Sequence, residues 1–306
     1  MEGGSYMSDR NNTVGFIGMG MMGGGMAANL LKADFDMVAY DIDPAKNERF
    51  AGLGAKIANG PAGVAQGAST VICIVETSAQ VRDVVLGDGG VLEGAQEGDI
   101  FVCSATVDPI LVKELHDILA EKSIRMLDAP VSGGVLRADS GELSIIVGGD
   151  ATVVDACRPY FDAISSNVFH MGEIGLGLAM KLCNNMITQV TKVVVAEAMT
   201  LGTKAGLDPQ EMYDVISVST GNSDSFRAAV PRYLSGDFSP GGTVDISYKD
   251  QELETAFAKA LGVPMFMAAA SQQVYQMARA AGLNKKDGSV LIKLYEEMAG
   301  VKLGPR

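Results

Sequence analysis

The sequence is poor in the residues that several kinds of functional site require. Its 306 residues include no tryptophan, only two histidines and only four cysteines. The cysteines form no C-x-x-C pair and lie in apolar stretches, which predicts buried, reduced thiols. They are Cys73, Cys103, Cys157 and Cys183. Because the two histidines lie far from any pair of cysteines, the sequence predicts no metal site.

Long apolar runs and an excess of basic residues are also missing. No apolar run approaches the ~18 residues that span a bilayer, and residues 1–12 have neither the basic segment nor the apolar core of a signal peptide. We therefore expect a cytoplasmic protein with no membrane contact, preceded by a flexible tail over residues 1–12. The 37 acidic residues outnumber the 24 basic ones, for a net charge of -13. Such a surface repels phosphate backbones, which excludes nucleic acid as a partner and requires a local positive site for any anionic ligand.

What the chain does contain is an alternation of short apolar strands and amphipathic helices up to about residue 173. The predicted strands cover 13–18, 36–41, 69–75, 99–104, 124–129, 143–148 and 167–171. Continuous apolar strands separated by helices are typical of a parallel sheet covered on both faces. The sequence therefore predicts an α/β domain over residues 13–173, a Rossmann-type, doubly wound and mostly parallel sheet.

The pattern changes after Gly172. One long helix is predicted from near Gly175 to the stop signal at Gly206. Every later segment is also helical in pattern, and no Gly/Ser linker separates the two halves. We expect an all-helical domain over residues 174–306, joined to the first domain by the long helix.

A glycine-rich loop follows the first predicted strand. It reads Gly18-Met19-Gly20-Met21-Met22-Gly23 and runs into a helix, which is G-x-G-x-x-G in its proper context. Gly18 permits the tight turn, Gly20 lets the backbone approach a pyrophosphate, and Gly23 allows close packing of helix and strand. The helix N-terminus then offers N–H groups to the phosphates.

Asp41 supports the same interpretation. It ends the second predicted strand about twenty residues later, where an acidic side chain binds the ribose hydroxyls of a dinucleotide. A carboxylate there repels a 2′-phosphate, and the nearest cation is Lys46 rather than an arginine. The sequence therefore favours NAD over NADP as the cofactor.

Dehydrogenation of an alcohol requires a general base. No tyrosine has a lysine four residues later, as short-chain dehydrogenases require. His116 lies among charged residues on an exposed helix face, and His170 closes the last strand without an obvious partner.

Lys181 is the third candidate for the base. It is the only charge between Glu173 and Lys192, and desolvation in such a setting makes a lysine a better proton acceptor. Asn185 lies one helical turn later on the same face, and Gly177 one turn earlier leaves room for a ligand. A lysine extending its ammonium group to solvent explains the same residues equally well.

Four motifs together resemble the β-hydroxyacid dehydrogenases, the family of 3-hydroxyisobutyrate dehydrogenase. They are GFIGMGMMGGGMAANL (15–30), DAPVSGGVLRADSGELSIIVGGD (128–150), GLGLAMKLCNNM (175–186) and YKD (248–250). They occur in the family's order and spacing over nearly the whole chain. The resemblance implies that Ser132, Gly133 and Gly134 hold the substrate carboxylate, that Lys181 takes the proton from the β-hydroxyl, and that Asn185 orients the substrate.

The resemblance also implies two residues near the cofactor, Thr106 and Lys249. Three departures from the family pattern stand out. Val75-Glu76-Thr77 replaces an apolar residue and proline, Ala105 replaces the serine before Thr106, and Gly242 stands where relatives often carry an aromatic residue. If Gly242 faces the substrate pocket, that pocket is wider than one made for a minimal C4 acid.

The sequence thus predicts an NAD-dependent dehydrogenase of short β-hydroxy acids, of the 3-hydroxyisobutyrate, threonate or glycerate/semialdehyde type. The alternatives are an imine reductase, which usually lacks the lysine, and a 6-phosphogluconate dehydrogenase-like enzyme, which has a longer helical domain. A third is a non-catalytic NAD-binding structural or regulatory module. Apolar faces in the small helical domain predict a homodimer or homotetramer.

Overall fold

The computed structural model describes residues 10–304. Residues 1–9 of the predicted tail lie outside this range. Arg10–Asn12 form a short 3-10 helix, and Arg10 Nη2 donates to Asp99 Oδ2 over 2.7 Å.

The first half is built on a six-stranded parallel sheet with the strand order β3-β2-β1-β4-β5-β6. The strands are β1 (Thr13–Ile17), β2 (Asp36–Tyr40), β3 (Lys56–Ile57), β4 (Thr70–Cys73), β5 (Ile100–Cys103) and β6 (Arg125–Asp128). Their carboxyl ends are in register, since Ile17 pairs with both Tyr40 and Cys73, and Cys103 pairs with Asp128. The loops that follow these strands therefore emerge along one edge, where open α/β sheets bind ligands.

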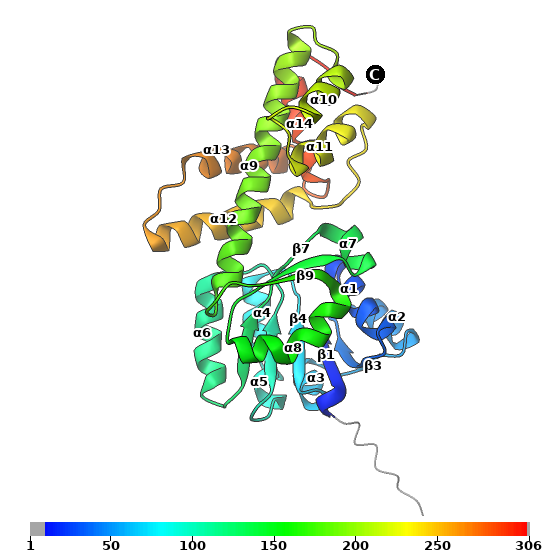
Figure 1. Ribbon diagram of the computed structural model, residues 1–306, viewed down its shortest axis with the longest axis vertical. Helices are drawn as coiled ribbons and strands as arrows, with labels where there is room; N and C mark the ends of the chain where they lie inside the picture. The colour runs from blue at the N-terminus through cyan, green and yellow to red at the C-terminus, as the bar shows by residue number, and fades with distance from the viewer. Residues whose placement is uncertain (1–9, 305–306) are drawn as a thin grey trace, which may run out of the picture. The chain divides into compact units, whose positions relative to one another are not determined.

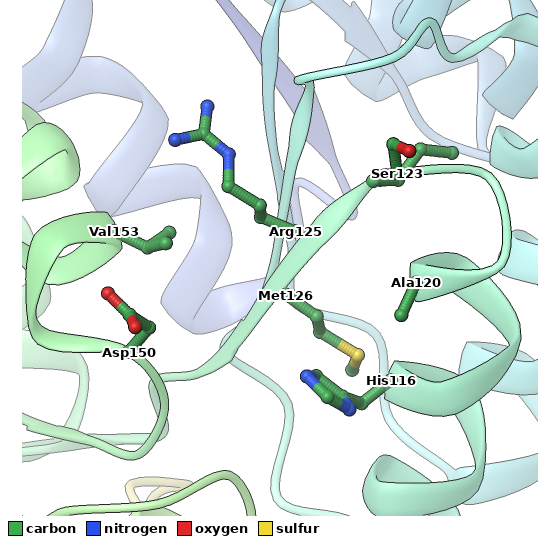
Figure 2. Close-up of a pocket in the computed structure, with 8 residues that line it drawn as sticks. His116, Ala120, Ser123, Arg125, Met126, Asp150 and Val153 are labelled. Carbon is green, nitrogen blue, oxygen red and sulfur yellow. The ribbon is translucent and has the colours of Figure 1, made fainter.

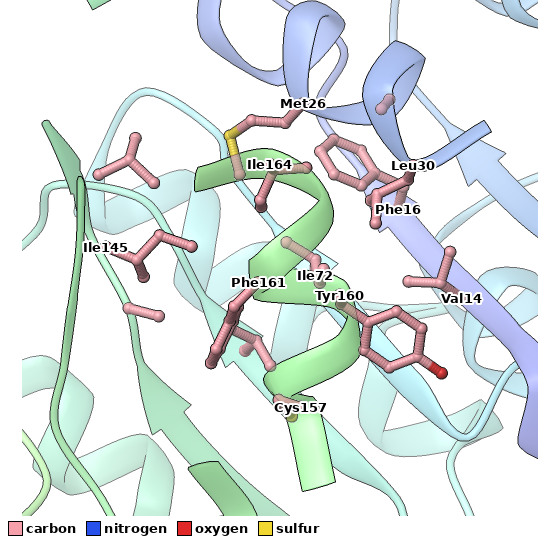
Figure 3. Packing of buried hydrophobic residues seen from close by; sticks show 14 of the residues in the cluster. Val14, Phe16, Met26, Leu30, Ile72, Ile145, Cys157, Tyr160, Phe161 and Ile164 are labelled. Carbon is pink, nitrogen blue, oxygen red and sulfur yellow. The ribbon is translucent and has the colours of Figure 1, made fainter. Parts of the chain in front are cut away.

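Helices cover both faces of this sheet (Figure 1). One face packs on α1 (Met21–Lys32), α2 (Pro44–Gly52) and α8 (Ala151–Ile164), and the other on α3 (Pro61–Gly67), α4 (Ser78–Leu86) and α6 (Pro109–Ala120). A single turn, α5 (Val91–Gly94), follows α4. On the first face Phe16 and Ile72 of the sheet pack against Met26, Leu30 and Phe161, all fully or almost fully buried (Figure 3). The predicted doubly wound Rossmann-type fold is confirmed.

A second, three-stranded sheet follows the first. It contains β7 (Val131–Ser132), β8 (Leu143–Val147) and β9 (Ser165–His170), with α7 (Gly134–Ser140) between β7 and β8. The last two predicted strands thus lie outside the main sheet, because β8 pairs with β7 and β9 instead of extending β6. β3 and β7 were not predicted, since two residues are too few to show a strand period.

The second half is helical, as predicted. It begins with α9 (Leu176–Lys204), an unbroken helix of 29 residues, which starts after Gly175 as the sequence indicates. The chain divides into two compact units within α9, between Lys181 and Leu182. The later elements are α10 (Pro209–Ser217), α11 (Asp224–Ser235), α12 (Val244–Leu261), α13 (Phe266–Ala280), the 3-10 helix η2 (Gly288–Leu291) and α14 (Ile292–Ala299).

The prediction for the cysteines holds at three of the four positions. Cys73, Cys103 and Cys157 are buried and free, and burial raises the pKa of Cys103 and Cys157 to about 12. The prediction was wrong for Cys183, which is exposed. It lies two residues after buried Lys181 on α9, and therefore on the opposite side of that helix. Among residues 10–304 no helix is both long enough and apolar enough to cross a membrane.

Candidate active site

The glycine-rich loop forms a tight turn between β1 and α1. Gly18 has φ +94°, and a Cβ there would lie 2.4 Å from the carbonyl oxygen of Ile74. A Cβ on Gly23 would lie 2.0 Å from the carbonyl oxygen of Gly18. At Gly20, the N-cap of α1, a Cβ would meet nothing within 4 Å. The backbone at Gly20 is therefore open on the side where a pyrophosphate would lie, whereas Gly18 and Gly23 are required by the turn itself.

The three methionines of this loop have different environments. Met19 is buried in the core, Met22 is half-buried, and Met21 is exposed. The N–H of Met19 donates to Asp41 Oδ2 over 2.7 Å, so the loop and the end of β2 are joined directly.

Asp41 is buried and already accepts several protein hydrogen bonds. Besides Met19, the N–H of Asp43 donates to Asp41 Oδ1 over 2.9 Å, and Lys46 Nζ lies 3.4 Å from the same oxygen. Asn47 fixes the backbone here, since its Oδ1 accepts from the N–H of Asp41 and its Nδ2 donates to the Asp41 carbonyl. A carboxylate has about four acceptor positions. Asp41 therefore keeps capacity for a ribose hydroxyl, while Lys46 remains bound to the carboxylate.

Two more predicted residues follow strands of the first unit. Thr106 lies half-buried shortly after β5, at the carboxyl edge of the main sheet. Ser132 ends β7, followed by Gly133 with φ +138° and Gly134 with φ +72°. These angles are open to glycine and rarely adopted by other residues, so this bend favours glycine at both positions.

The loop after β4 explains one departure from the family pattern. Thr77 is the N-cap of α4, its Oγ1 accepts from the N–H of Gln80 over 3.2 Å, and Gln80 Oε1 accepts from the N–H groups of Glu76 and Thr77. This capping box fixes the start of α4 at Thr77.

Lys181 is buried on α9 with a relative exposure of 8%, and Asn185 lies one turn later on the same helix. The expectation that Gly177 leaves room for a ligand was wrong. A Cβ on Gly177 would lie 2.5 Å from the carbonyl oxygen of Ile146 and 2.8 Å from Asp128 Oδ2. The missing side chain therefore allows close packing of α9 on protein atoms.

Asp128, which the sequence analysis did not single out, anchors the start of α9. It is fully buried at the end of β6, and its two carboxylate oxygens accept from the N–H groups of Gly175 and Leu178, each over 2.6 Å. Burial raises the pKa of Asp128, and these two hydrogen bonds oppose the increase. The Asp128 carboxylate therefore caps the N-terminus of α9. Lys181 lies on the same helix, three residues after Leu178.

A second residue missed in the sequence is Asp250, although it belongs to the YKD motif. It is buried on α12, accepts a hydrogen bond from Asn185 Nδ2 at Oδ2 over 2.8 Å, and forms an ion pair with Lys249 Nζ at Oδ1 over 3.1 Å. Asp250 thus connects two predicted site residues. The amide nitrogen of Asn185 is directed at Asp250, which sets the orientation of the Asn185 side chain.

Glu254 lies one turn after Asp250 and is buried, with a relative exposure of 4%. Within residues 10–304 neither of its carboxylate oxygens has a hydrogen-bond partner. Burial and the nearby charge of Asp250 raise its pKa from 4.5 to about 8. The folded protein therefore keeps Glu254 protonated at neutral pH, while the unfolded chain releases the proton.

This difference predicts that the free energy of unfolding falls as the pH rises from about 4.5 to about 8, because the folded state then binds more protons than the unfolded state. Glu254→Gln removes this term. We expect the advantage of the variant over the wild type in free energy of unfolding to grow by about 4 kcal/mol between about pH 5 and about pH 8.5. Chemical denaturation at both values measures the difference, with the exposed Glu252→Gln as control. If Glu254→Gln raised the free energy of unfolding equally at the two pH values, the raised pKa of Glu254 would be contradicted.

Both histidines belong to the first unit. His170 Nε2 is 2.8 Å from the carbonyl oxygen of Gly149 and 3.1 Å from that of Gly172, so this nitrogen acts as a donor. His116 lines a cavity of about 340 Å³ with Arg125, Met126 and Asp150 (Figure 2). Because Arg125 is the first residue of β6, this cavity lies at the amino end of the strand. It is remote from the edge where the glycine-rich loop lies. Among residues 10–304 no group of three or more metal-ligating side chains was found.

The first unit contains two features that could hold a dinucleotide, a helix N-terminus for the phosphates and a carboxylate for the ribose. Gly20 offers open backbone at a helix N-terminus, and Asp41 lies at the end of the adjacent strand, linked to the loop through Met19. The order of the main sheet is the doubly wound order whose switch point lies between β1 and β4.

Comparisons with known proteins agree with this geometry. Residues 13–172 match the NAD binding domain of 6-phosphogluconate dehydrogenase, and residues 175–295 match the NAD-binding domain of NADP-dependent 3-hydroxyisobutyrate dehydrogenase. The 2-(hydroxymethyl)glutarate dehydrogenase of Eubacterium barkeri is 34% identical over 96% of this chain and 98% of its own length. The L-threonate dehydrogenase of Cupriavidus necator is 37% identical over 93% of this chain and 96% of its own.

A solved structure shares the fold over the same length. The 3-hydroxyisobutyrate dehydrogenase of Mycobacterium tuberculosis, solved with L-serine, is 30% identical and has a TM-score of 0.86, covering 92% of this chain and 98% of that one. Both halves of the chain thus match NAD(P)-binding domain families, and these dehydrogenases align with it over nearly their whole length. This chain belongs to the β-hydroxyacid dehydrogenase family.

Proposed function

We propose that the protein transfers a hydride between NAD and a short β-hydroxy acid, with Lys181 as the general acid/base. The observation that carries the proposal is the placement of Lys181. It is buried on a helix whose first turn is capped by Asp128, and Asn185 follows it by one turn, held by Asp250. The amine of a lysine held in such a position can accept the proton of a substrate hydroxyl.

The residues would divide the reaction as follows. Ser132 and the N–H groups of Gly133 and Gly134 hold the substrate carboxylate, and Asn185 orients the hydroxyl-bearing carbon. Lys181 Nζ takes the proton of the β-hydroxyl as its carbon is oxidised, and returns a proton when the carbonyl is reduced. When bound, the nicotinamide supplies the hydride acceptor. Gly18–Gly23 and Asp41 would hold the dinucleotide, with Thr106 and Lys249 beside the nicotinamide.

The preference for NAD over NADP rests on Asp41. Its carboxylate is buried and hydrogen-bonded by two backbone N–H groups, so it is fixed as an acceptor of ribose hydroxyls. The nearest cation, Lys46, pairs with Asp41 itself. A 2′-phosphate brought to this position would meet a negative charge.

The test is a set of initial rates with NAD and NADP on 3-hydroxyisobutyrate, L-threonate and 2-(hydroxymethyl)glutarate, the acids after which related enzymes are named. We expect turnover with at least one acid and a larger kcat/KM for NAD. A larger value for NADP would overturn the cofactor assignment. Turnover of cyclic imines without turnover of any acid would overturn the reaction.

Gly242 is proposed to widen the substrate pocket. A Cβ on Gly242 would meet nothing within 4 Å, while its N–H donates to Asp287 Oδ2 and its carbonyl accepts from Gly288. A side chain can therefore be added without displacing protein atoms. We expect Gly242→Phe to reduce kcat/KM for the larger acids by about tenfold or more relative to 3-hydroxyisobutyrate, with Gly242→Ala as control. If Gly242→Phe left the order of kcat/KM values among the acids unchanged, Gly242 would not determine the width of the pocket.

We also propose a homodimer or homotetramer working in the cytoplasm. Within the second unit, large apolar side chains are exposed on several helices, among them Ile187, Leu201, Val215 and Phe266. Exposed apolar surface of this kind is usually covered by another subunit. Sedimentation equilibrium of the purified protein tests the assembly, and a monomer at micromolar concentration would contradict it.

A further inference from the structure

An arginine lies directly over the loop proposed to hold the substrate carboxylate. Arg137 is exposed on α7, four residues after Gly133. A Cβ built on Gly133 would lie 2.9 Å from both Cβ and Cδ of Arg137. The aliphatic part of the arginine therefore packs across Gly133, and the guanidinium group begins one bond beyond Cδ.

The backbone that carries Arg137 is held firmly. Asn29 of α1 donates from Nδ2 to the carbonyl oxygens of Ala138 and Asp139, over 2.9 and 3.1 Å. Ala138 packs closely on α1, since a Cβ on Gly25 would lie 2.7 Å from its carbonyl carbon. The hydrogen bond to Ala138 thus fixes the backbone next to Arg137, and the aliphatic part of the Arg137 side chain packs on Gly133.

The guanidinium forms no ion pair or hydrogen bond with any side chain or backbone group of residues 10–304. The nearest carboxylates in sequence are engaged elsewhere. Asp139 is directed at α1, where its Oδ1 lies over Gly25, and Glu142 Oε2 accepts from Ser140 Oγ over 2.9 Å. Arg137 is thus a cation beside the loop proposed to hold the substrate carboxylate, and its guanidinium has no carboxylate partner among residues 10–304.

We propose that Arg137 binds a second acidic group on the substrate, so that the preferred substrates are β-hydroxy acids with an additional carboxylate or comparable anion. The inference rests on the proposed function, because it takes Ser132–Gly134 as the site of the first carboxylate. A guanidinium binds a carboxylate through two parallel N–H donors and loses little conformational freedom in doing so. Arg137 then selects among acids that share the same carboxylate and β-hydroxyl.

The test uses two acids that share the carboxylate and the β-hydroxyl and differ in the group on the α-carbon. 2-(Hydroxymethyl)glutarate carries a carboxyethyl group where 3-hydroxyisobutyrate carries a methyl group. We expect Arg137→Ala to lower kcat/KM for the dicarboxylate by about 10- to 100-fold, the range for one charge-assisted pair. The value for the monocarboxylate should change by less than about threefold. Arg137→Lys should recover part of the lost kcat/KM for the dicarboxylate, because lysine restores the positive charge but not the two parallel N–H donors of the guanidinium.

Arg158→Ala is the matched control, since Arg158 is an exposed arginine of the same unit that pairs with Asp162. It changes the net charge equally and should leave both acids unaffected. An equal loss on both acids in Arg137→Ala, an increased KM for the dinucleotide instead, or no loss at all would each overturn the proposal. If wild-type protein oxidises neither these nor other hydroxy acids, the failure lies with the proposed function and not with Arg137.

Discussion

Lys181→Ala is expected to lower kcat by about 10²-fold or more, the usual contribution of a positioned general base. The side chain is buried on α9 with Asn185 one turn away, so its loss removes the proton acceptor while the glycine-rich loop and Asp41 stay intact. Dinucleotide affinity, measured by fluorescence of the reduced cofactor, should therefore remain near the wild-type value. Small primary amines added to the variant should restore part of the rate by replacing the missing base.

Two further variants separate the proton acceptor from a positive charge. Lys181→Arg keeps the charge but cannot lose a proton near neutral pH, so it should be as slow as the alanine variant. Lys204→Ala removes an exposed lysine at the other end of α9 and should turn over normally. If Lys181→Ala kept the wild-type rate, another group would be the base. If only Lys181→Arg were fully active, the lysine would act through its charge.

Asp128→Ala is expected to destabilise the protein by about 3 kcal/mol. Both N–H groups that lose their acceptor, those of Gly175 and Leu178, are buried, and each unsatisfied group costs about 1–3 kcal/mol. The methyl side chain of alanine also leaves a space where Gly148 and Gly177 approach the carboxylate closely. Thermal unfolding should show a Tm lower by roughly 5–10 °C.

Asp108→Ala serves as the control for this variant. Asp108 is an ordinary N-cap of α6 that accepts one backbone N–H, at the surface, and its loss should cost about 1 kcal/mol. Asp128→Asn keeps one acceptor oxygen, so its Tm should lie between those of Asp128→Ala and Asp108→Ala. Equal Tm values for Asp128→Ala and Asp108→Ala would mean that the start of α9 is held by packing alone.

The parts of the site that the sequence predicts are those encoded over short distances. The glycine-rich loop is contiguous, and Lys181 and Asn185 are one helical turn apart on a helix whose limits are marked by Gly175 and Gly206. Their local pattern therefore specifies the geometry. The parallel sheet of the first half followed from the alternation of apolar strands and helices, whereas its strand order comes from the structure.

The parts that the sequence does not predict depend on contacts between distant residues. Asp128 reaches Gly175 across 47 positions, and Asn185 reaches Asp250 across 65. No periodic pattern indicates such a pair. The wrong expectation for Gly177 has the same cause, because the backbone of β8, which packs where a side chain would lie, is distant in sequence. The separate sheet of β7, β8 and β9 was also not predicted, because the pairing of these strands has no local signal.

Absorbance of the reduced nicotinamide tests the central claim most directly. Wild-type protein is mixed with NAD and either 3-hydroxyisobutyrate or 2-hydroxybutyrate, an isomer with its hydroxyl on the α-carbon. The panel is extended to 2-(hydroxymethyl)glutarate and L-threonate. The proposed mechanism predicts absorbance that rises with at least one β-hydroxy acid and stays flat with the α-hydroxy isomer, because Lys181 and the carboxylate loop fix the distance between carboxylate and hydroxyl. Reduction of NAD by the α-hydroxy acid alone, or by no acid although NAD binds, would contradict it.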